Sequence, residues 1–271
     1  MTIRNEDLQI LRALEAAWQE RKELAGLLRF YYDLYALQFR VKAGASDPQV
    51  REEMARCWRL EGGIPQLTFD QLHLEAAPFG RLVEEISHLF ARREYPALGI
   101  AEGAHTPQEF LALAQRAFDT WDTLTVPGPG GAGEVGNPTI MVVGFALAPY
   151  LQHAAEVILP HLDLTLWRRG YCPICGGRPN LALLPERGDT CRLICCRCNA
   201  AWPFASLCCT LCGSEDVQRG QFGDGAYQVQ VCENCDQYLK IVDLGKVQHP
   251  VYPQVERLLT VGLDLAAQHE E

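Results

Sequence analysis

The sequence "LICCRCNAAWPFASLCCTLCG", residues 193–213, is the stretch that decides the fold of this chain. It contains six of the chain's twelve cysteines and twice sets two of them side by side. Cysteines this dense are disulfide partners, reactive thiols or metal ligands. The compartment and the spacing of the remaining cysteines decide between these three roles.

The N-terminus indicates the compartment. Residues 1–23 carry charges every few positions and lack the apolar segment and small-residue cleavage site of a secretion signal. No uninterrupted apolar run reaches the roughly 18 residues that a membrane-spanning helix requires. We therefore expect a cytoplasmic protein without membrane insertion, in which closely spaced cysteines favour metal binding or redox chemistry over disulfides.

The cysteines divide the chain into two regions. The chain has 271 residues, 48% of them hydrophobic, which is enough to bury a sizeable core and is more typical of two domains than of one. Eleven cysteines lie between Cys172 and Cys235, and only Cys57 lies elsewhere. We expect Cys57 to be a buried or half-buried thiol on a helix.

Residues 1–165 are predicted to form an all-helical domain. Apolar residues recur at helical spacing through residues 8–35, and a core-facing stripe is the simplest interpretation. Helix starts are predicted at Asp47, Thr68, Thr106 and Asn137, with Glu109 completing a capping box. The apolar segment from Pro138 to about Leu159 is predicted to be a central helix, kinked near Pro149.

No catalytic motif stands out. Gly128–Gly133 matches the spacing G-x-G-x-x-G, but no clear strand precedes it and Pro129 lies inside the loop, so we interpret it as a surface linker. Paired carboxylates, a Ser/His/Asp set and an H-E-x-x-H motif do not emerge from the sequence. We therefore expect a protein that is not an enzyme.

An internal repeat sorts the cysteines. Two C-x2-C pairs separated by nineteen residues occur once from Cys172 to Cys198 and again from Cys209 to Cys235. Moving the first copy by 37 positions, the distance from Cys172 to Cys209, superposes all four cysteines on the second copy. The extra cysteines Cys191, Cys196 and Cys208 have no counterpart. The predicted metal ligands are Cys172, Cys175, Cys195, Cys198, Cys209, Cys212, Cys232 and Cys235.

The residues after each pair support two sites of four cysteines. A chain that curls around a metal commonly needs a positive φ after the second cysteine, and these positions hold Gly176, Asn199, Gly213 and Asp236. Four thiolates bind zinc or iron and leave no position open for substrate or water. We expect two metal ions per chain, which are structural or, if iron, carry one electron.

The charge argues against a nucleic-acid binder. The formal net charge is -10, and nonspecific affinity for nucleic acids comes mainly from neutralising phosphates. Residues 168–246 contain nine Lys or Arg against eight Asp or Glu, and each four-thiolate site adds a charge of about -2.

The cysteine region resembles a known family. "WRRGYCPICGGRP" (167–179), "CCRCNAAW" (195–202), "CTLCG" (209–213) and "CENCDQYLK" (232–240) are similar to the formate dehydrogenase accessory protein family, FdhE. The resemblance implies a helical domain followed by two tandem rubredoxin-like (zinc-ribbon) four-cysteine modules. We expect the modules at 166–203 and 204–245 and a helical tail at 246–271. It also implies a role in maturing respiratory formate dehydrogenases, contact with their catalytic subunit, and iron at the eight cysteines named above.

Two alternatives stay open. The first alternative is a rubredoxin-like redox carrier, and the second is a zinc-ribbon binding module for another partner. The aromatic residues Trp167, Tyr171 and Trp202 either belong to a binding surface or are ordinary core.

Overall fold

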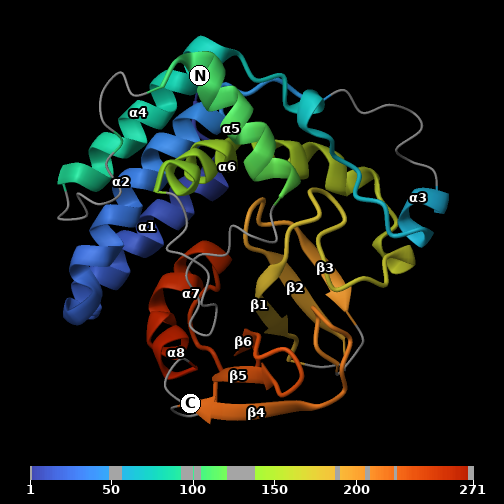
Figure 1. The fold of residues 1–271 in the computed structure, drawn as a ribbon. Coiled ribbons are helices and arrows are strands. Elements are labelled where there is room, and N and C mark those ends of the chain that lie inside the picture. Colours follow the sequence, from blue (N-terminus) through green and yellow to red (C-terminus); the bar gives the residue numbers. More distant parts are fainter. Residues whose placement is uncertain are drawn as a thin grey trace. The chain divides into compact units, whose positions relative to one another are not determined.

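A computed structural model describes residues 2–48, 57–92, 100, 105–120, 138–186, 190–204, 208–222 and 225–267. The chain divides into two compact units (Figure 1). The first comprises Met1–Pro48 and Phe69–Ala154, and the second comprises Gln49–Thr68 and Ala155–Glu271. The domain boundaries expected at residues 165, 203 and 245 stay predictions.

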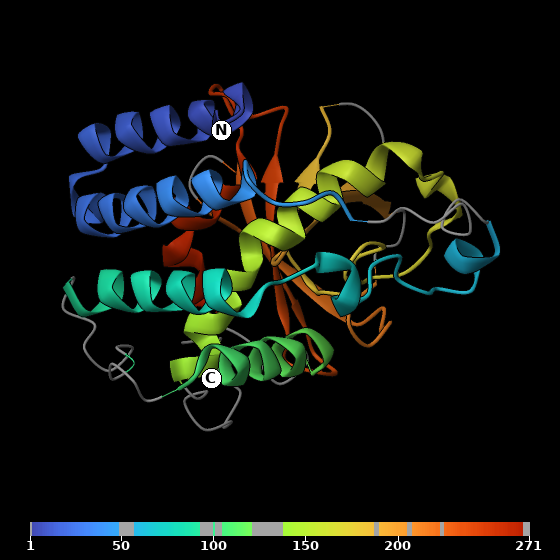
Figure 2. The ribbon, with the colours of Figure 1, turned by 90° about the horizontal axis from the view of Figure 1, so that it is seen from above.

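The first unit is helical, as its sequence period predicts. Figure 2 shows three of its helices side by side: α1 (Asn5–Glu20), α2 (Ala25–Lys42) and α4 (Ala76–Arg92). The stripe of apolar residues in α1 and α2 is buried, with Leu14, Leu28 and Leu34 fully inside. An ion pair between Lys42 Nζ and Asp7 Oδ1, 2.5 Å long, joins the same two helices where both side chains are 4% exposed.

The capping box predicted at Thr106 is present. It opens α5 (Pro107–Asp119), where Thr106 Oγ1 accepts a hydrogen bond from Glu109 N at 3.3 Å. Glu109 Oε2 in turn accepts one from Thr106 N at 2.6 Å. The start predicted at Thr68 leads only to a short 3-10 helix, Phe69–Leu72. The segment after Pro48, Asn137 and the Gly128–Gly133 loop lie outside the described residues.

The central apolar helix is α6 (Pro138–Ile158), which contains Pro149. It begins at the predicted residue and belongs mostly to the first unit. By length and composition Pro138–His161 is apolar enough to cross a membrane, with a mean hydropathy of 1.4. However, 61% of the 18-residue window on which this hydropathy is based is buried inside the protein, as in a core helix. Val143, Leu147 and Leu151 are almost fully inside.

The second unit is built on one six-stranded sheet. In spatial order its strands are β3-β2-β1-β6-β5-β4 (Figure 1). Neighbours are antiparallel within each repeat, whereas β1 and β6 pair in parallel and join the two repeats. The strands are β1 (Pro179–Leu184), β2 (Cys191–Cys195), β3 (Ala201–Phe204), β4 (Val217–Phe222), β5 (Tyr227–Cys232) and β6 (Tyr238–Asp243).

The two repeats have the same strand register. The pair Ala182↔Leu193 between β1 and β2 becomes Arg219↔Gln230 when both partners move by 37 positions, and that pair exists between β4 and β5. The pair Leu193↔Trp202 becomes Gln230↔Leu239 in the same way. The sequence repeat is therefore a structural repeat, and its two copies share one sheet.

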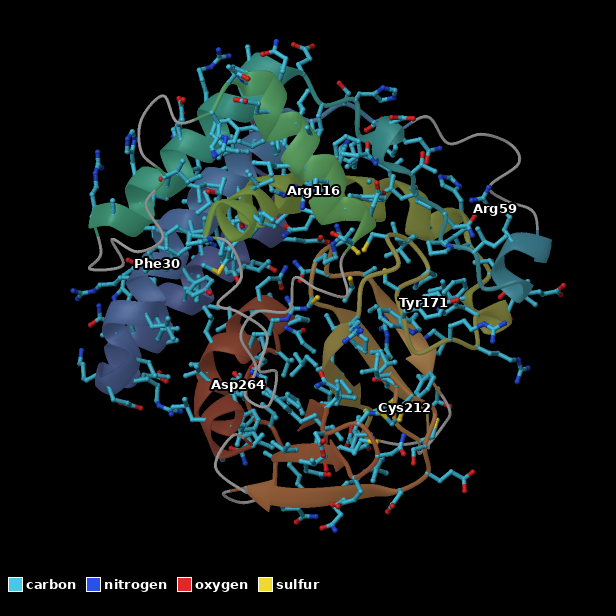
Figure 3. The ribbon with its side chains drawn as sticks, in the orientation of Figure 1. Phe30, Arg59, Arg116, Tyr171, Cys212 and Asp264 are labelled. Atoms are coloured by element: carbon cyan, nitrogen blue, oxygen red, sulfur yellow. The ribbon has the colours of Figure 1, made fainter. Side chains whose placement is uncertain are left out.

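The C-terminal helices are bound to this sheet. They are α7 (Pro253–Leu259) and α8 (Val261–Ala266). Asp264 of α8 points toward the sheet (Figure 3), where Oδ1 accepts a hydrogen bond from Tyr238 Oη at 2.9 Å and Oδ2 lies 2.8 Å from Lys240 Nζ. In α7, Glu256 is 1% exposed and accepts a hydrogen bond from Tyr227 Oη at 3.2 Å. A short helix, α3 (Cys57–Glu61), also belongs to the second unit.

Candidate metal centres

The structure brings the eight selected cysteines together in two groups of four. The first group consists of Cys172, Cys175, Cys195 and Cys198, and the second consists of Cys209, Cys212, Cys232 and Cys235. Within each group all four sulfur atoms lie within 4.8 Å of one another. These are the two sets that the 37-residue repeat predicts.

The sulfur separations fit a metal ion better than disulfides. In the first group Sγ of Cys175 lies 3.5 Å from Sγ of Cys195 and 3.6 Å from Sγ of Cys198. In the second group the Cys212–Cys232 separation is 3.6 Å. A tetrahedral ion with metal–sulfur bonds of about 2.3 Å places its sulfurs about 3.8 Å apart, whereas a disulfide bond is only about 2.05 Å long. Four thiols at these separations match the donor set of zinc or iron.

The backbone forms the same turn at all four C-x2-C pairs. In each turn the N–H of the first cysteine donates to the carbonyl of the fifth residue after it. These bonds run from Cys172 to Gly177 (2.8 Å), from Cys195 to Ala200 (2.9 Å), from Cys209 to Ser214 (2.7 Å) and from Cys232 to Gln237 (3.0 Å). The repeated turn fixes both thiols of a pair on the same side of the chain.

The residue after each pair has the predicted positive φ. The angle is 72° at Gly176, 58° at Asn199, 76° at Gly213 and 53° at Asp236. This conformation is rare for residues other than glycine, and asparagine and aspartate reach it most easily among the others. The choice of these four residue types therefore follows from the turn that surrounds the thiols.

The two groups differ in burial. In the first group the side chains of all four cysteines are at most 6% exposed. In the second group Cys212 is exposed and Cys235 is half-buried (Figure 3 labels Cys212). Water can therefore reach the second group, whereas the first is enclosed by protein.

The pKa values of the thiols shift in both directions within each group. In the first group, burial is the main cause that raises the pKa of Cys172 well above its usual range. In the same group, hydrogen bonds with neighbouring thiols outweigh burial and lower the pKa of Cys195 well below its usual range. In the second group, burial raises the pKa of Cys235. A hydrogen bond from the backbone of Ser214, followed by one from Asn234, lowers the pKa of Cys212 to about 6. Metal binding needs thiolates, so an ion bound at either group displaces the protons of the thiols whose pKa is raised.

The extra cysteines lie outside both groups. Cys191 is half-buried on β2, and its Sγ donates a hydrogen bond to the carbonyl of Phe204 at 3.2 Å across the β2–β3 pair. Cys196 and Cys208 are also half-buried. The backbone of Cys57 lies on α3, but its side chain is outside the described residues.

The two tryptophans near the cysteines are core residues. Trp202 is fully buried, Trp167 is 2% exposed, and the indole N–H of Trp202 donates to the carbonyl of Arg169 at 3.1 Å. Their interpretation as part of a binding surface is therefore wrong. Tyr171 is half-buried, and its hydroxyl donates to the carbonyl of Gly63 at 2.7 Å.

Sequence reasoning missed two partners of the first group. The guanidinium of Arg257 in α7 donates to the carbonyl of Cys195 at 2.7 Å, and also to the side chains of Asn180 and Asn199. The backbone of Gln66 and Leu67 donates to the carbonyls of Pro173 and Ile174, both at 2.9 Å. Both partners are remote from the cysteine motifs in sequence, and no local pattern identifies them.

Comparisons with known proteins place the chain near one family. No family model matches. The chain is 32% identical over 111 residues to a "Protein FdhE homolog" of Aquifex aeolicus, which is 38% of this chain and 39% of that protein. It is 26% identical over 123 residues to the protein of the same name from Shewanella sp. (strain MR-4), which is 43% of this chain and 41% of that protein. The match thus spans about two fifths of the length of these curated relatives.

The fold has a counterpart among solved structures. The crystal structure of the FdhE protein from Pseudomonas aeruginosa matches with a TM-score of 0.65 and 20% identity, over 98% of this chain and 92% of that one. At this identity the match shows a shared fold. Together with the curated relatives, it confirms the resemblance to the FdhE family.

Proposed function

We propose that this chain, which resembles the FdhE family, is an accessory protein in the maturation of a respiratory formate dehydrogenase. It acts by binding the catalytic subunit of that enzyme in the cytoplasm, and it does not catalyse a reaction. The observation that carries the proposal is the sequence similarity to relatives named FdhE homolog. The fold shared with a solved FdhE protein agrees with it.

The chemistry of the two cysteine groups supports a role in binding. Four thiolates around one ion leave no coordination position for a substrate or a water molecule. We propose that the eight cysteines hold two ions, zinc or iron. Each repeat spans only 27 residues from its first to its last cysteine. That is too short for a hydrophobic core of its own, so the ion stabilises the turns and the strands that carry them.

A deletion strain tests the maturation role. We expect cells without this protein to make the formate dehydrogenase polypeptide in normal amount but to reduce little dye with formate. An immunoblot measures the polypeptide, and formate-dependent reduction of benzyl viologen measures the active enzyme. Full activity without the protein would contradict the proposal.

Rescue with matched variants tests the metal sites. The variant Cys195→Ser removes a thiol from the first group, whereas Cys196→Ser changes the adjacent thiol, which lies outside it. We expect poor rescue by the first variant and normal rescue by the second. Affinity purification from the native cell should also recover the catalytic subunit with the wild-type protein.

A second function is favoured by one specific observation. Cys212 is exposed to solvent, as an electron-transfer site would require. A rubredoxin-like carrier would hold iron at the second group, and ferric thiolate absorbs visible light whereas zinc thiolate does not. Protein purified after anaerobic expression that is colourless and contains only zinc would exclude this alternative.

A further inference from the structure

The two cysteine groups have the same local geometry but different surroundings. A divalent ion bound by four thiolates carries a net charge of about -2, and enclosing such a charge in protein is costly unless cations or N–H groups compensate it. The first group is enclosed and the second is open. The residues that enclose the first group therefore need to supply the compensation.

Two arginines contact residues of the first group. Arg197 lies between Cys195 and Cys198 in the sequence, is 4% exposed, and its backbone N–H donates to Cys195 Sγ at 3.4 Å. Its side chain packs on Gly177, where an added Cβ would lie 2.7 Å from Arg197 Cδ and 3.1 Å from Cys195 Sγ. The side chain of Arg197 thus lies beside the thiols, in space that a residue larger than glycine at position 177 would fill.

The second arginine anchors a helix to the same group. Arg257 of α7 donates to Asn180 Oδ1 at 2.8 Å, to Asn199 Oδ1, and to the carbonyl of Cys195 at 2.7 Å. Asn199 is the residue with positive φ that follows Cys198. One guanidinium therefore holds the β1 strand, the second turn and the carbonyl of a cysteine in fixed positions.

A second segment covers the other turn of the first group. The backbone N–H groups of Gln66 and Leu67 bond the carbonyls of the two residues between Cys172 and Cys175. Pro65 lies close enough that a Cβ on Gly176 would be 3.3 Å from its Cγ. Both turns of the first group are thus held by segments from outside the repeat.

The second repeat lacks the residues that make these contacts. The position equivalent to Arg197 in the second repeat, 37 residues later, holds Asn234. The positions equivalent to Asn180 and Asn199, which both bond Arg257, hold Val217 and Asp236. Asn234 does reach its group, since its Nδ2 donates to Cys212 Sγ at 3.5 Å, but it carries no charge. Beside Cys212, Leu211 is 41% exposed.

We propose that the two sites are not equivalent: the second group is an exchangeable site for a soft divalent ion, and the first is a structural site that Arg257 locks. Exchange proceeds by ligand substitution, in which donor atoms of an external thiol or chelator replace the thiolates one after another, beginning at the exposed Cys212. The ion leaves with its charge unchanged, the freed thiolates take up protons from solvent, and no electron is transferred. Arg257 acts on the first group as a positioning residue.

A chelator challenge of the full-length protein tests the inequivalence. The protein is first loaded with zinc, and atomic emission should find two ions per chain. Excess 4-(2-pyridylazo)resorcinol then withdraws the zinc while its absorbance reports release. We expect two phases of one ion each, with rates that differ at least tenfold. Samples quenched with N-ethylmaleimide during the fast phase should carry the label on the second group, as peptide mass spectrometry will show.

Other outcomes separate this inference from the proposed function on which its metal premise rests. Release of both ions at one rate, or labelling of the first group before the second, would overturn the inference and leave the metal binding intact. Protein that takes up no zinc, iron or cobalt would refute metal binding itself, and with it the inference. Neither result depends on formate dehydrogenase activity.

Two variants test the role of Arg257. Arg257→Gln removes the fork that bonds Asn180, Asn199 and Cys195, and we expect it to speed the slow phase about tenfold and leave the fast phase unchanged. Arg192→Gln, which changes an exposed arginine on β2, is the control and should alter neither phase. If Arg257→Gln does not fold, Arg257→Lys retains the charge but loses the fork and should still accelerate the slow phase. An unchanged slow phase in a folded variant, or equal acceleration of both phases, would overturn the assignment.

Discussion

Leu181 of β1 lies opposite Lys240 of β6 in parallel register, and this pairing joins the two repeats. Lys240 is 4% exposed, and its Nζ lies 2.8 Å from Asp264 Oδ2 and donates to the carbonyl of Arg257 at 3.1 Å. Strand β6 therefore pairs with the first repeat through β1, and it is bound to the C-terminal helices through Lys240.

We expect Lys240→Met to destabilise both repeats together. It removes the ion pair and leaves Asp264, whose side chain is 26% exposed, without that partner. Because the partner is partly solvated, the expected cost is about 2 kcal/mol, below that of a fully buried pair. Urea unfolding measures the cost. The control Lys246→Met changes a lysine that is 44% exposed and lies 3.7 Å from Asp243, and it should cost less than about 0.5 kcal/mol. Separate transitions for the two repeats in the metal-loaded protein would contradict a joined sheet.

Adjacent cysteines provide a matched test of the ligand assignment. Cys209→Ser should lower the metal content from two ions to one, because a group of three thiols on so small a core binds its ion poorly. Cys208→Ser changes the neighbouring thiol, which lies outside the group, and should leave both ions bound. Metal analysis together with limited proteolysis checks both variants. Loss of an ion from Cys208→Ser alone would show that the repeat assigns the ligands incorrectly.

Gly170 should not tolerate a side chain. An added Cβ would lie 1.9 Å from the carbonyl oxygen of Thr210 in the first turn of the second group, and that atom belongs to the backbone. We expect Gly170→Ala to cost about 3 kcal/mol through the shift that it forces. Gly262→Ala is the control in the same unit, because nothing lies within 4 Å of its added Cβ. Replacing this glycine in α8 should be neutral or stabilise the protein by up to about 1 kcal/mol, as thermal unfolding of both variants will show.

The capping box at α5 predicts a pH dependence. Hydrogen bonds from the backbone and then the side chain of Thr106 lower the pKa of Glu109. A lowered value means that the folded chain releases the proton more readily than the unfolded chain. The contribution of Glu109 is therefore present above the ordinary pKa of glutamate and is lost as the pH falls through the lowered value. NMR titration of Glu109 should find its pKa higher in Thr106→Val, which removes the hydroxyl, and an unchanged value would contradict the box.

The sequence predicted the parts of the candidate site that repeat locally. The spacing of the C-x2-C pairs sorts eight cysteines from Cys191, Cys196 and Cys208, and the same division appears in the structure. The turn residues were predictable because a positive φ restricts the residue type, as at Asn199. The capping box was predictable because Thr106 and Glu109, which form it, lie within four residues of each other.

The contacts that the sequence did not predict are all long-range. Parallel pairing of β1 with β6 joins strands that are distant in the chain and leaves no local pattern. Arg257 is one charge on a short helix, and only the fold brings it to Cys195. Trp202 could be surface or core because an aromatic side chain suits both environments, and its burial decides for the core.

Head-to-tail joining of the repeats makes the sheet open-ended. Two repeats related by a twofold axis would form a closed pair, with the same strand of each repeat at the two ends of the sheet. Here the two ends are different strands of the repeat. One end is β4, the counterpart of β1, and the other is β3, the counterpart of β6. Pro203 in β3 has no N–H and so makes that end a poor template for another strand. The end at β4 contains no proline. For protein engineering the sheet is thus an array of two units, and we expect that a third copy of the 37-residue unit could be added at β4 in the register that β1 and β6 already use.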